Sequence, residues 1–375
     1  MRFVSKKELA RRHAALRAAM ARDGYDALLV AGNTEAGQRG FIRYTADWRL
    51  WGGTAYLLLP LEGEPVLVMG LGSQADYAKA IGMVRDTRPV LVRLPEVISV
   101  FREKGLERGR IGVAGLNRIM PHGDAKDLLA AFPQARFEDA TLLMEGIMVA
   151  LSPEEVGYAE ETHRAVEMAL NRLDEVLAPG KTELEVIGEV AKTAAAHGCL
   201  DGIAHVSCEP AGSIRPASER VFQPDDIVRV FLEYYGLNGF FVELGAIFSF
   251  RKPSEEKRRK FETTVRAIDR AVELMRPGTP AADLCRAVEA TYREDGWKIT
   301  GRRLWDFHGQ GLNSLMPPLG MPESTEILSE NMMLNIHPGV LTADGWGASV
   351  TNNYIVTPEG GHALGGFQHR WRVVG

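Results

Sequence analysis

The chain has 375 residues, of which 45% are apolar and 25% are charged, and its formal net charge is -5. This length allows two domains with proper cores. The mild charge and the dispersed Lys and Arg argue against a nucleic acid or a membrane surface as a partner, and no apolar run approaches the roughly 18 residues of a membrane span. We therefore expect a cytoplasmic protein with reduced cysteines, Cys199, Cys208 and Cys285.

The first part of the chain alternates strand-like and helix-like segments. "YDALLVAG", "TAYLLLP" and "PVLVMG" are short β-rich runs separated by turn residues, whereas "EVISVFREKG" and "DAKDLLAAF" are typical of helices. This alternation predicts an α/β domain over residues 1–148.

A strong helix start marks the boundary to the next domain. In "LSPEEVGYAEETHRAVEMAL", Ser152 is a good N-cap, Pro153 suits the first helical position, and Glu155 completes a capping box. We therefore expect a second domain over residues 149–375.

The second domain contains an internal repeat. Segments that begin at Glu161 and Glu262 each read as a helix, a Pro-Gly-x-Thr break, a second helix and a closing glycine. A histidine-bearing segment and a pair of strands follow each of them. The period of about 100 residues is too long for a solenoid. The pattern indicates two αα-ββ units that face each other about a pseudo-twofold, with their strands curved round a shared pocket.

This layout resembles the pita-bread fold of methionine aminopeptidase, prolidase and creatinase. "LSPEEVGYAEETHRAVEMAL" is similar to that family's entry into the catalytic domain, and "HGQGL" to its His-Gly-x-Gly turn. The resemblance covers the whole chain. It implies an α+β fold, with an N-terminal creatinase/prolidase-like α/β domain followed by a pita-bread domain, and it implies a homodimer.

The resemblance also implies where metal ligands would lie, because metal-dependent members hold two ions with two aspartates, a histidine and two glutamates. Carried over by position, these ligands become, in that order, Leu232, Glu243, His308, His337 and Thr351. Glu233, next to the first of these positions, is expected on the opposite face of its strand. Since most of these positions have changed chemistry, we expect no two-ion centre.

Four residues are candidates for catalysis: His205, Glu243, His308 and His337. His205 aligns with the acid/base histidine of creatinase, and an imidazole with a pKa near ~6.5 can take and return a proton at neutral pH. The alternative for His205 and His337 is a structural histidine bonded to backbone. Creatine itself is a poor candidate substrate, because other creatinase positions, such as Leu315, do not match.

Six further residues are candidates for substrate binding. In creatinase, the loop that corresponds to "YTADWRLWGG" supplies an aromatic residue and an arginine that hold the substrate's carboxylate. The candidates are Trp48, Arg49, Trp51, Phe241, Thr351 and Asn352. A guanidinium pairs with a carboxylate in bidentate fashion, although a loop tryptophan is also a common anchor of dimer interfaces.

Three functions fit these residues. The first is a metal-independent, creatinase-like hydrolase or lyase that acts on a C–N bond of a small zwitterionic or N-substituted carboxylate, with histidine as general acid/base. The second is a hydrolase with one divalent ion (Zn, Fe or Mn) held by Glu243, His308 and His337. The third is a pita-bread protein that binds ligands or peptides without catalysis. The pattern argues against a two-metal aminopeptidase.

Overall fold

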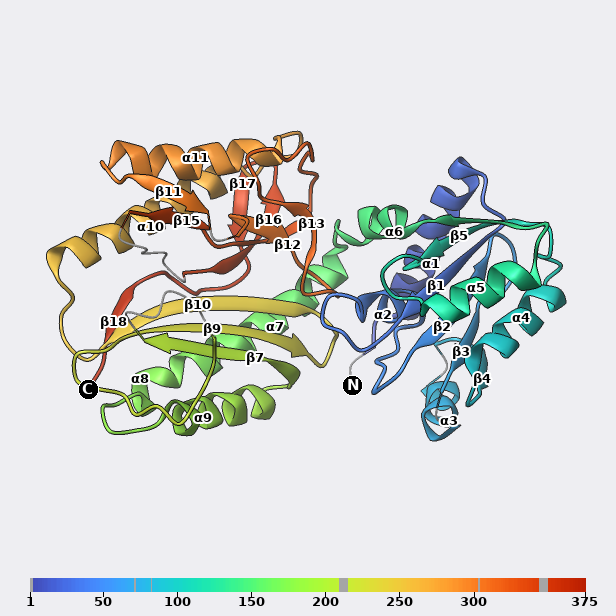
Figure 1. The fold of residues 1–375 in the computed structure, drawn as a ribbon, viewed down its shortest axis with the longest axis horizontal. Coiled ribbons are helices and arrows are strands. Elements are labelled where there is room, and N and C mark those ends of the chain that lie inside the picture. The colour runs from blue at the N-terminus through green and yellow to red at the C-terminus, as the bar shows by residue number, and fades with distance from the viewer. Residues whose placement is uncertain (1–2, 71, 82, 209–214, 303, 344–349) are drawn as a thin grey trace. The chain divides into compact units, whose positions relative to one another are not determined.

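The structure is a computed structural model that describes residues 3–70, 72–81, 83–208, 215–302, 304–343 and 350–375. It divides into two compact units, Met1–Met148 and Val149–Gly375 (Figure 1). The predicted fold class, a mixed α+β chain with an N-terminal α/β part, is confirmed. None of the helices in the described part of the chain is long and apolar enough to cross a membrane.

The first unit is built on a mixed sheet with the strand order β4-β3-β2-β1-β5-β6. The strands are β1 (Ala27–Gly32), β2 (Ala55–Pro60), β3 (Val66–Met69), β4 (Asp86–Pro89), β5 (Arg110–Ala114) and β6 (Arg136–Asp139). The helices are α1 (Lys6–Asp23), α2 (Gly40–Ala46), α3 (Gly72–Ile81), α4 (Arg93–Glu103), α5 (His122–Ala131) and α6 (Thr141–Met148). Every residue of the central strand β1 is buried, which is why "ALLVAG" reads as one continuous apolar run.

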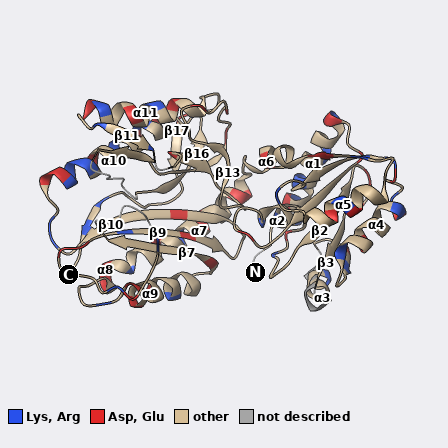
Figure 2. Cartoon of the chain, in the orientation of Figure 1, with Lys and Arg blue, Asp and Glu red and all other residues tan. Residues whose placement is uncertain are grey.

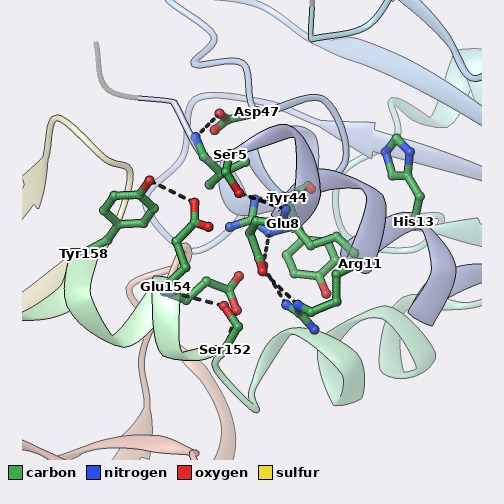
Figure 3. A network of polar contacts seen from close by, with 12 residues as sticks. Ser5, Glu8, Arg11, His13, Tyr44, Asp47, Ser152, Glu154 and Tyr158 are labelled. Atoms are coloured by element: carbon green, nitrogen blue, oxygen red, sulfur yellow. Dashed lines mark hydrogen bonds and ion pairs between the residues drawn. The ribbon is translucent and has the colours of Figure 1, made fainter.

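The start of α1 shows how local chemistry fixes an element. Ser5 caps the helix by accepting the Glu8 N–H at 3.0 Å, and the Glu8 carboxylate pairs with Arg11 at 2.7 Å (Figure 3). The N–H of Val4 donates to the carboxylate of Asp47 at 2.6 Å. An N-cap of this kind contributes about 1 kcal/mol to helix stability.

The second unit begins with α7 (Pro153–Asn171), whose predicted capping box is confirmed: Ser152 and Glu155 each accept the other's backbone N–H. The helices α8 (Leu173–Val176) and α9 (Glu183–Ala196) follow. The first sheet has the order β18-β10-β9-β7-β8. Its strands are β7 (Cys199–Cys208), β8 (Arg215–Pro216), β9 (Ile227–Gly236), β10 (Phe241–Ser249) and β18 (Trp371–Val373).

The second half of this unit repeats the first. It contains α10 (Glu255–Glu273), α11 (Ala281–Glu294) and a second sheet in the order β13-β12-β14-β16-β17. These strands are β12 (Phe307–Gly309), β13 (Met316–Leu319), β14 (Met333–Ile336), β16 (Asn352–Thr357) and β17 (Gly360–Ala363), and β11 (Ile299–Arg302) pairs with β15 (Val340–Thr342). The helices lie outside and the two sheets face each other (Figure 1).

Each sheet of this unit has a helix side and an inner side. A side chain added at Gly236 of β9 would meet Thr162 of α7, so the even-numbered residues of β9 face the helices. On β14, Leu334 and Ile336 join the core with α10 and α11, so Asn335 points inward. The helices themselves carry interspersed acidic and basic residues, as α10 and α11 show in Figure 2.

Candidate active site

Three ionisable side chains meet between the two sheets. Glu243 comes from the middle of β10, His308 from β12, and His337 follows the end of β14. One ligand atom from each lies within 4.8 Å of the others. His308 Nε2 is 3.4 Å from Glu243 Oε2, and the two imidazole rings are 5.2 Å apart between centroids. The structure thus brings together three of the four predicted catalytic residues.

The turn after β14 holds His337 in place. Its backbone N–H donates to the carbonyl of Asp306 at 2.8 Å, and the N–H of Gly339 donates to the Asp306 carboxylate at 2.8 Å. A Cβ at Gly339 would lie 2.1 Å from the carbonyl oxygen of Leu304, so only glycine fits there. The sequence His-Pro-Gly therefore ends the strand at the point where an imidazole can face the cluster.

Hydrogen bonding defines the protonation of His308. Its Nδ1 lies 2.9 Å from the carbonyl oxygen of Gly309, and because a carbonyl only accepts, Nδ1 must carry a proton. In a neutral ring Nε2 would then present a lone pair to the Glu243 carboxylate, which is repulsive. Glu243 Oε1 is buried and has no hydrogen-bond partner among the described residues. The geometry therefore calls for a positive charge between these atoms, either a proton or a cation.

Burial controls His337 in a different way. Desolvation lowers its pKa to about 4, although the negative charge of Glu243 works in the opposite direction. His337 keeps some solvent exposure by surface area, yet protein atoms surround the ring. Its imidazole is therefore neutral at pH 7, in the form that ligates metals or donates through one nitrogen.

The donor set matches one metal ion in chemistry, and one of its separations fits as well. Two imidazoles and one carboxylate are typical ligands of catalytic zinc and non-haem iron. Two ligands of a tetrahedral ion, each roughly 2.1 Å from it, lie about 3.4 Å apart, which is the distance between His308 Nε2 and Glu243 Oε2.

His205, the fourth predicted catalytic residue, lies outside the cluster of three. It pairs with Phe231 of β9, which pairs with Gly245 of β10, so His205 shares the inner face with Glu243 one row away. Its ring lies 6.2 Å from that of Phe231. Burial lowers its pKa, which favours the neutral, proton-accepting form.

The predicted substrate ligands of the second unit have structural partners. The hydroxyl of Thr351 donates to Asn335 Oδ1 at 2.6 Å. Asn352 Oδ1 accepts from His163 Nε2 at 2.9 Å, and it lies on the opposite face of β16 from Asn353. These contacts do not favour Thr351 and Asn352 as substrate ligands. Phe241 lies on the inner face of β10, with its ring 5.0 Å from that of Tyr235.

The other predicted ligands belong to the first unit, so their role stays a prediction. Trp48 is buried and its ring meets that of Tyr77 edge-on at 5.8 Å. Trp51 is 66% exposed, and Arg49 is partly exposed.

The expected face of Glu233 is wrong, and two inner-face residues were missed. Glu233 pairs directly with Glu243 and points inward, while Leu232 points to the helices. Arg229, four residues earlier on the same strand, is buried on the same inner face. The alternation in "IVRVFLEYY" carries this signal, because Val228, Val230 and Leu232 form the apolar set that faces the helices.

Comparison with known proteins agrees with this architecture. The model of metallopeptidase family M24 matches residues 158–358. Ectoine hydrolase of Halomonas elongata is 23% identical, over 97% of this chain and 96% of its own, and a probable dipeptidase PepE of Mycobacterium tuberculosis is 25% identical over 68% and 67%.

Solved structures with this fold include dipeptidase PepE from Mycobacterium ulcerans, which has a TM-score of 0.81 and 22% sequence identity, with full coverage of both chains. Another is Xaa-Pro dipeptidase from Bacillus anthracis, which has a TM-score of 0.83 and 18% sequence identity, with coverage of 98% of this chain and 100% of that one. The predicted membership of the pita-bread family is confirmed, while the creatinase-like assignment within it stays a prediction. The chain belongs to metallopeptidase family M24.

Proposed function

We propose that this protein is a hydrolase that cleaves a C–N bond of a small zwitterionic or N-substituted carboxylate. The observation that carries the proposal is the buried Glu243 carboxylate, which faces His308 at 3.4 Å and leaves Oε1 without a partner among the described residues. The match to ectoine hydrolase over nearly the whole of both chains supports this substrate class. Ectoine, a cyclic amidine that carries a carboxylate, is therefore the first substrate to assay.

In the proposed reaction, water adds to the carbon of the C–N bond and a proton goes to the leaving nitrogen. Glu243 orients the water or a cationic nitrogen, and His205 takes the proton from water and returns it to the nitrogen. His308 and His337 donate hydrogen bonds to the negative charge that develops on the substrate. Arg229, on the same inner face, pairs with the substrate's carboxylate.

The family name raises the question of a metal. A two-ion centre does not fit, because Leu232 points to the helices and Thr351 donates to Asn335. One ion fits the donors Glu243, His308 and His337, which is our second candidate, a mononuclear hydrolase. An ion there would supply an activated water near neutral pH. A homodimer is proposed from the resemblance for either case.

The test of the proposed function is hydrolysis of ectoine and of N-substituted amino acids, followed by mass spectrometry. We expect a product heavier than the substrate by one water, formed by the wild type and not by the Glu243→Gln variant. Release of proline from dipeptides with added manganese, and no turnover of these carboxylates, would overturn it. Ligand binding without any turnover would favour the non-catalytic alternative.

Metal content separates the two candidates. Elemental mass spectrometry is applied to protein purified without added metal or chelator. About one equivalent of zinc, iron or manganese, lost in the His337→Ala variant, would establish the mononuclear centre. A metal content below about a tenth of an equivalent, unchanged after soaking with metal, would mean that activity rests on His205 as the acid/base and on Glu243 as the group that orients the water.

A further inference from the structure

The strand β10 bonds to the second sheet on both sides of Glu243. At one end, the N–H of Phe241 donates to the carbonyl of Gly311 at 2.8 Å. At the other end, the N–H of Gly245 donates to the carbonyl of Thr351 at 3.1 Å. Between these two backbone contacts, at Glu243, the partners of the peptide groups are side chains.

Two asparagine side chains satisfy the backbone N–H and the backbone carbonyl of Glu243. Its N–H donates to Asn353 Oδ1 at 2.9 Å, and its carbonyl accepts from Asn335 Nδ2 at 3.1 Å. Both asparagines are fully buried. Buried peptide groups need hydrogen-bond partners. Losing either side-chain amide would leave the N–H or the carbonyl of Glu243 without one, at a cost of about 1–3 kcal/mol in stability. We call this pair of side chains the amide clamp.

The amide clamp connects Glu243 to the strand of His308. Asn335 lies directly opposite His308 on one side and opposite Asn353 on the other, so the three side chains share one row of the second sheet. The distance between the Glu243 carboxylate and the His308 ring therefore depends on this row. The amides are neutral, so they hold the peptide without adding a charge to the cluster.

The same network reaches the second inner carboxylate. Asn353 Nδ2 donates to Gln310 Oε1 at 2.7 Å, and Gln310 Nε2 donates to Glu233 Oε1 at 2.9 Å. Each amide in this chain donates on one side and accepts on the other, which defines its orientation. Since Glu233 stands opposite Glu243, the network reaches both residues, through the peptide groups of Glu243 and the carboxylate of Glu233.

We propose that Asn335 and Asn353 are positioning residues of the active site, which hold Glu243 at its working distance from His308. The effect of the two asparagines on the position of Glu243 does not depend on the reaction, whereas their effect on the rate rests on the proposed hydrolase function. A misplacement of about 1 Å can reduce a rate on the order of 100-fold, so the clamp acts on turnover more than on substrate affinity.

The test compares Asn335→Asp with Thr351→Val. An aspartate at 335 still accepts from Thr351, but its second oxygen now faces the Glu243 carbonyl, and two acceptors repel each other. The control variant removes the bond from Thr351 and leaves the Asn335 donor in place. Crystal structures of both variants report the separation of Glu243 Oε2 and His308 Nε2, which is 3.4 Å here.

We expect this separation to change by about 1 Å or more in Asn335→Asp and to stay unchanged in Thr351→Val. With ectoine as substrate, kcat should fall on the order of 100-fold in Asn335→Asp with KM within about threefold. If Asn335→Asp does not fold, Asn353→Leu, which removes the acceptor for the Glu243 N–H, is measured in the same way.

An unchanged separation in the variant that folds, or an equal shift in Thr351→Val, would overturn the proposal. If the wild type hydrolyses none of the carboxylates, the proposed function fails, and the crystal structures still decide whether the clamp holds Glu243.

Discussion

The two halves of the second unit share a fold and divide the chemistry between them. The inner face of the first sheet carries His205, Arg229, Glu233 and Glu243. The inner face of the second sheet presents His308 and the neutral amides of Asn335 and Asn353. The apolar alternation that fixes each sheet against its helices is the same in both halves. A repeat can therefore keep its packing while its inward side chains diverge, since the two sets occupy alternate positions.

The sharpest way to test this division is to neutralise one carboxylate at a time. Glu243→Gln keeps the size of the side chain and its backbone bonds to the amide clamp, but removes the charge that faces His308. We expect kcat/KM to fall roughly 1,000-fold, because the charge that orients the water or the cationic nitrogen is lost. In the matched variant Glu233→Gln, kcat/KM should fall less. An equal fall in kcat/KM would assign the central role to both carboxylates.

The second largest effect is expected from Arg229, the cation of the same half. Arg229→Met removes the charge from a buried site on the inner face. We expect KM for a substrate with a carboxylate to rise on the order of 10-fold to 100-fold, with kcat within about threefold. Steady-state kinetics measure both constants, and Arg229→Lys should recover part of the affinity. A loss confined to kcat would contradict a role in binding.

On the side of the second half, Asp306 organises the turn of His337. Asp306→Ala removes the acceptor of the Gly339 N–H and one of the two carboxylates that pair with the Arg302 guanidinium. We expect the free energy of unfolding to fall by about 2–4 kcal/mol, measured by urea denaturation. Asp306→Asn keeps an acceptor for Gly339 and should retain more activity than Asp306→Ala. Equal activity of the two variants would show that the turn needs no such anchor.

The smallest expected effect is the pH dependence given by His369. Burial lowers its pKa to about 4, below the ordinary value of 6.5, so the unfolded chain binds more protons than the folded one between these values. Its contribution to stability is present above pH 6.5 and is lost as the pH falls towards 4. Urea denaturation at pH 7 and pH 5 should show a smaller loss for His369→Gln than for the wild type. Parallel losses would mean that this imidazole titrates normally.

The domain boundary and the repeat could be predicted from the sequence because both depend on local signals. The capping box at Ser152, the repeated Pro-Gly breaks and the strand that ends at His337 can be read without knowing any long-range contact. The cluster of Glu243, His308 and His337 was expected from the resemblance to the pita-bread family, because these residues stand at positions of its metal ligands.

What the sequence did not predict depends on register and on partners from the other half. The faces of Leu232 and Glu233 were exchanged, since a shift of one residue inverts every side chain of a strand. The hydrogen bonds of Thr351 to Asn335 and of Asn352 to His163 were not predicted, while the role of both residues in substrate binding stays a prediction. These contacts join residues far apart in the chain, so no local sequence pattern predicts them.

The turn after β14 has a mechanical consequence. Asp306, which fixes the backbone of His337, precedes β12, the strand that carries His308. Both imidazoles therefore depend on the same segment, residues 306–308, for their placement. Glu243 belongs to the other sheet, so its distance to these two rings depends on the bonds that β10 makes with the second half. A change in those bonds would therefore alter the distance from the carboxylate to the imidazoles and leave the spacing between the two imidazoles unchanged.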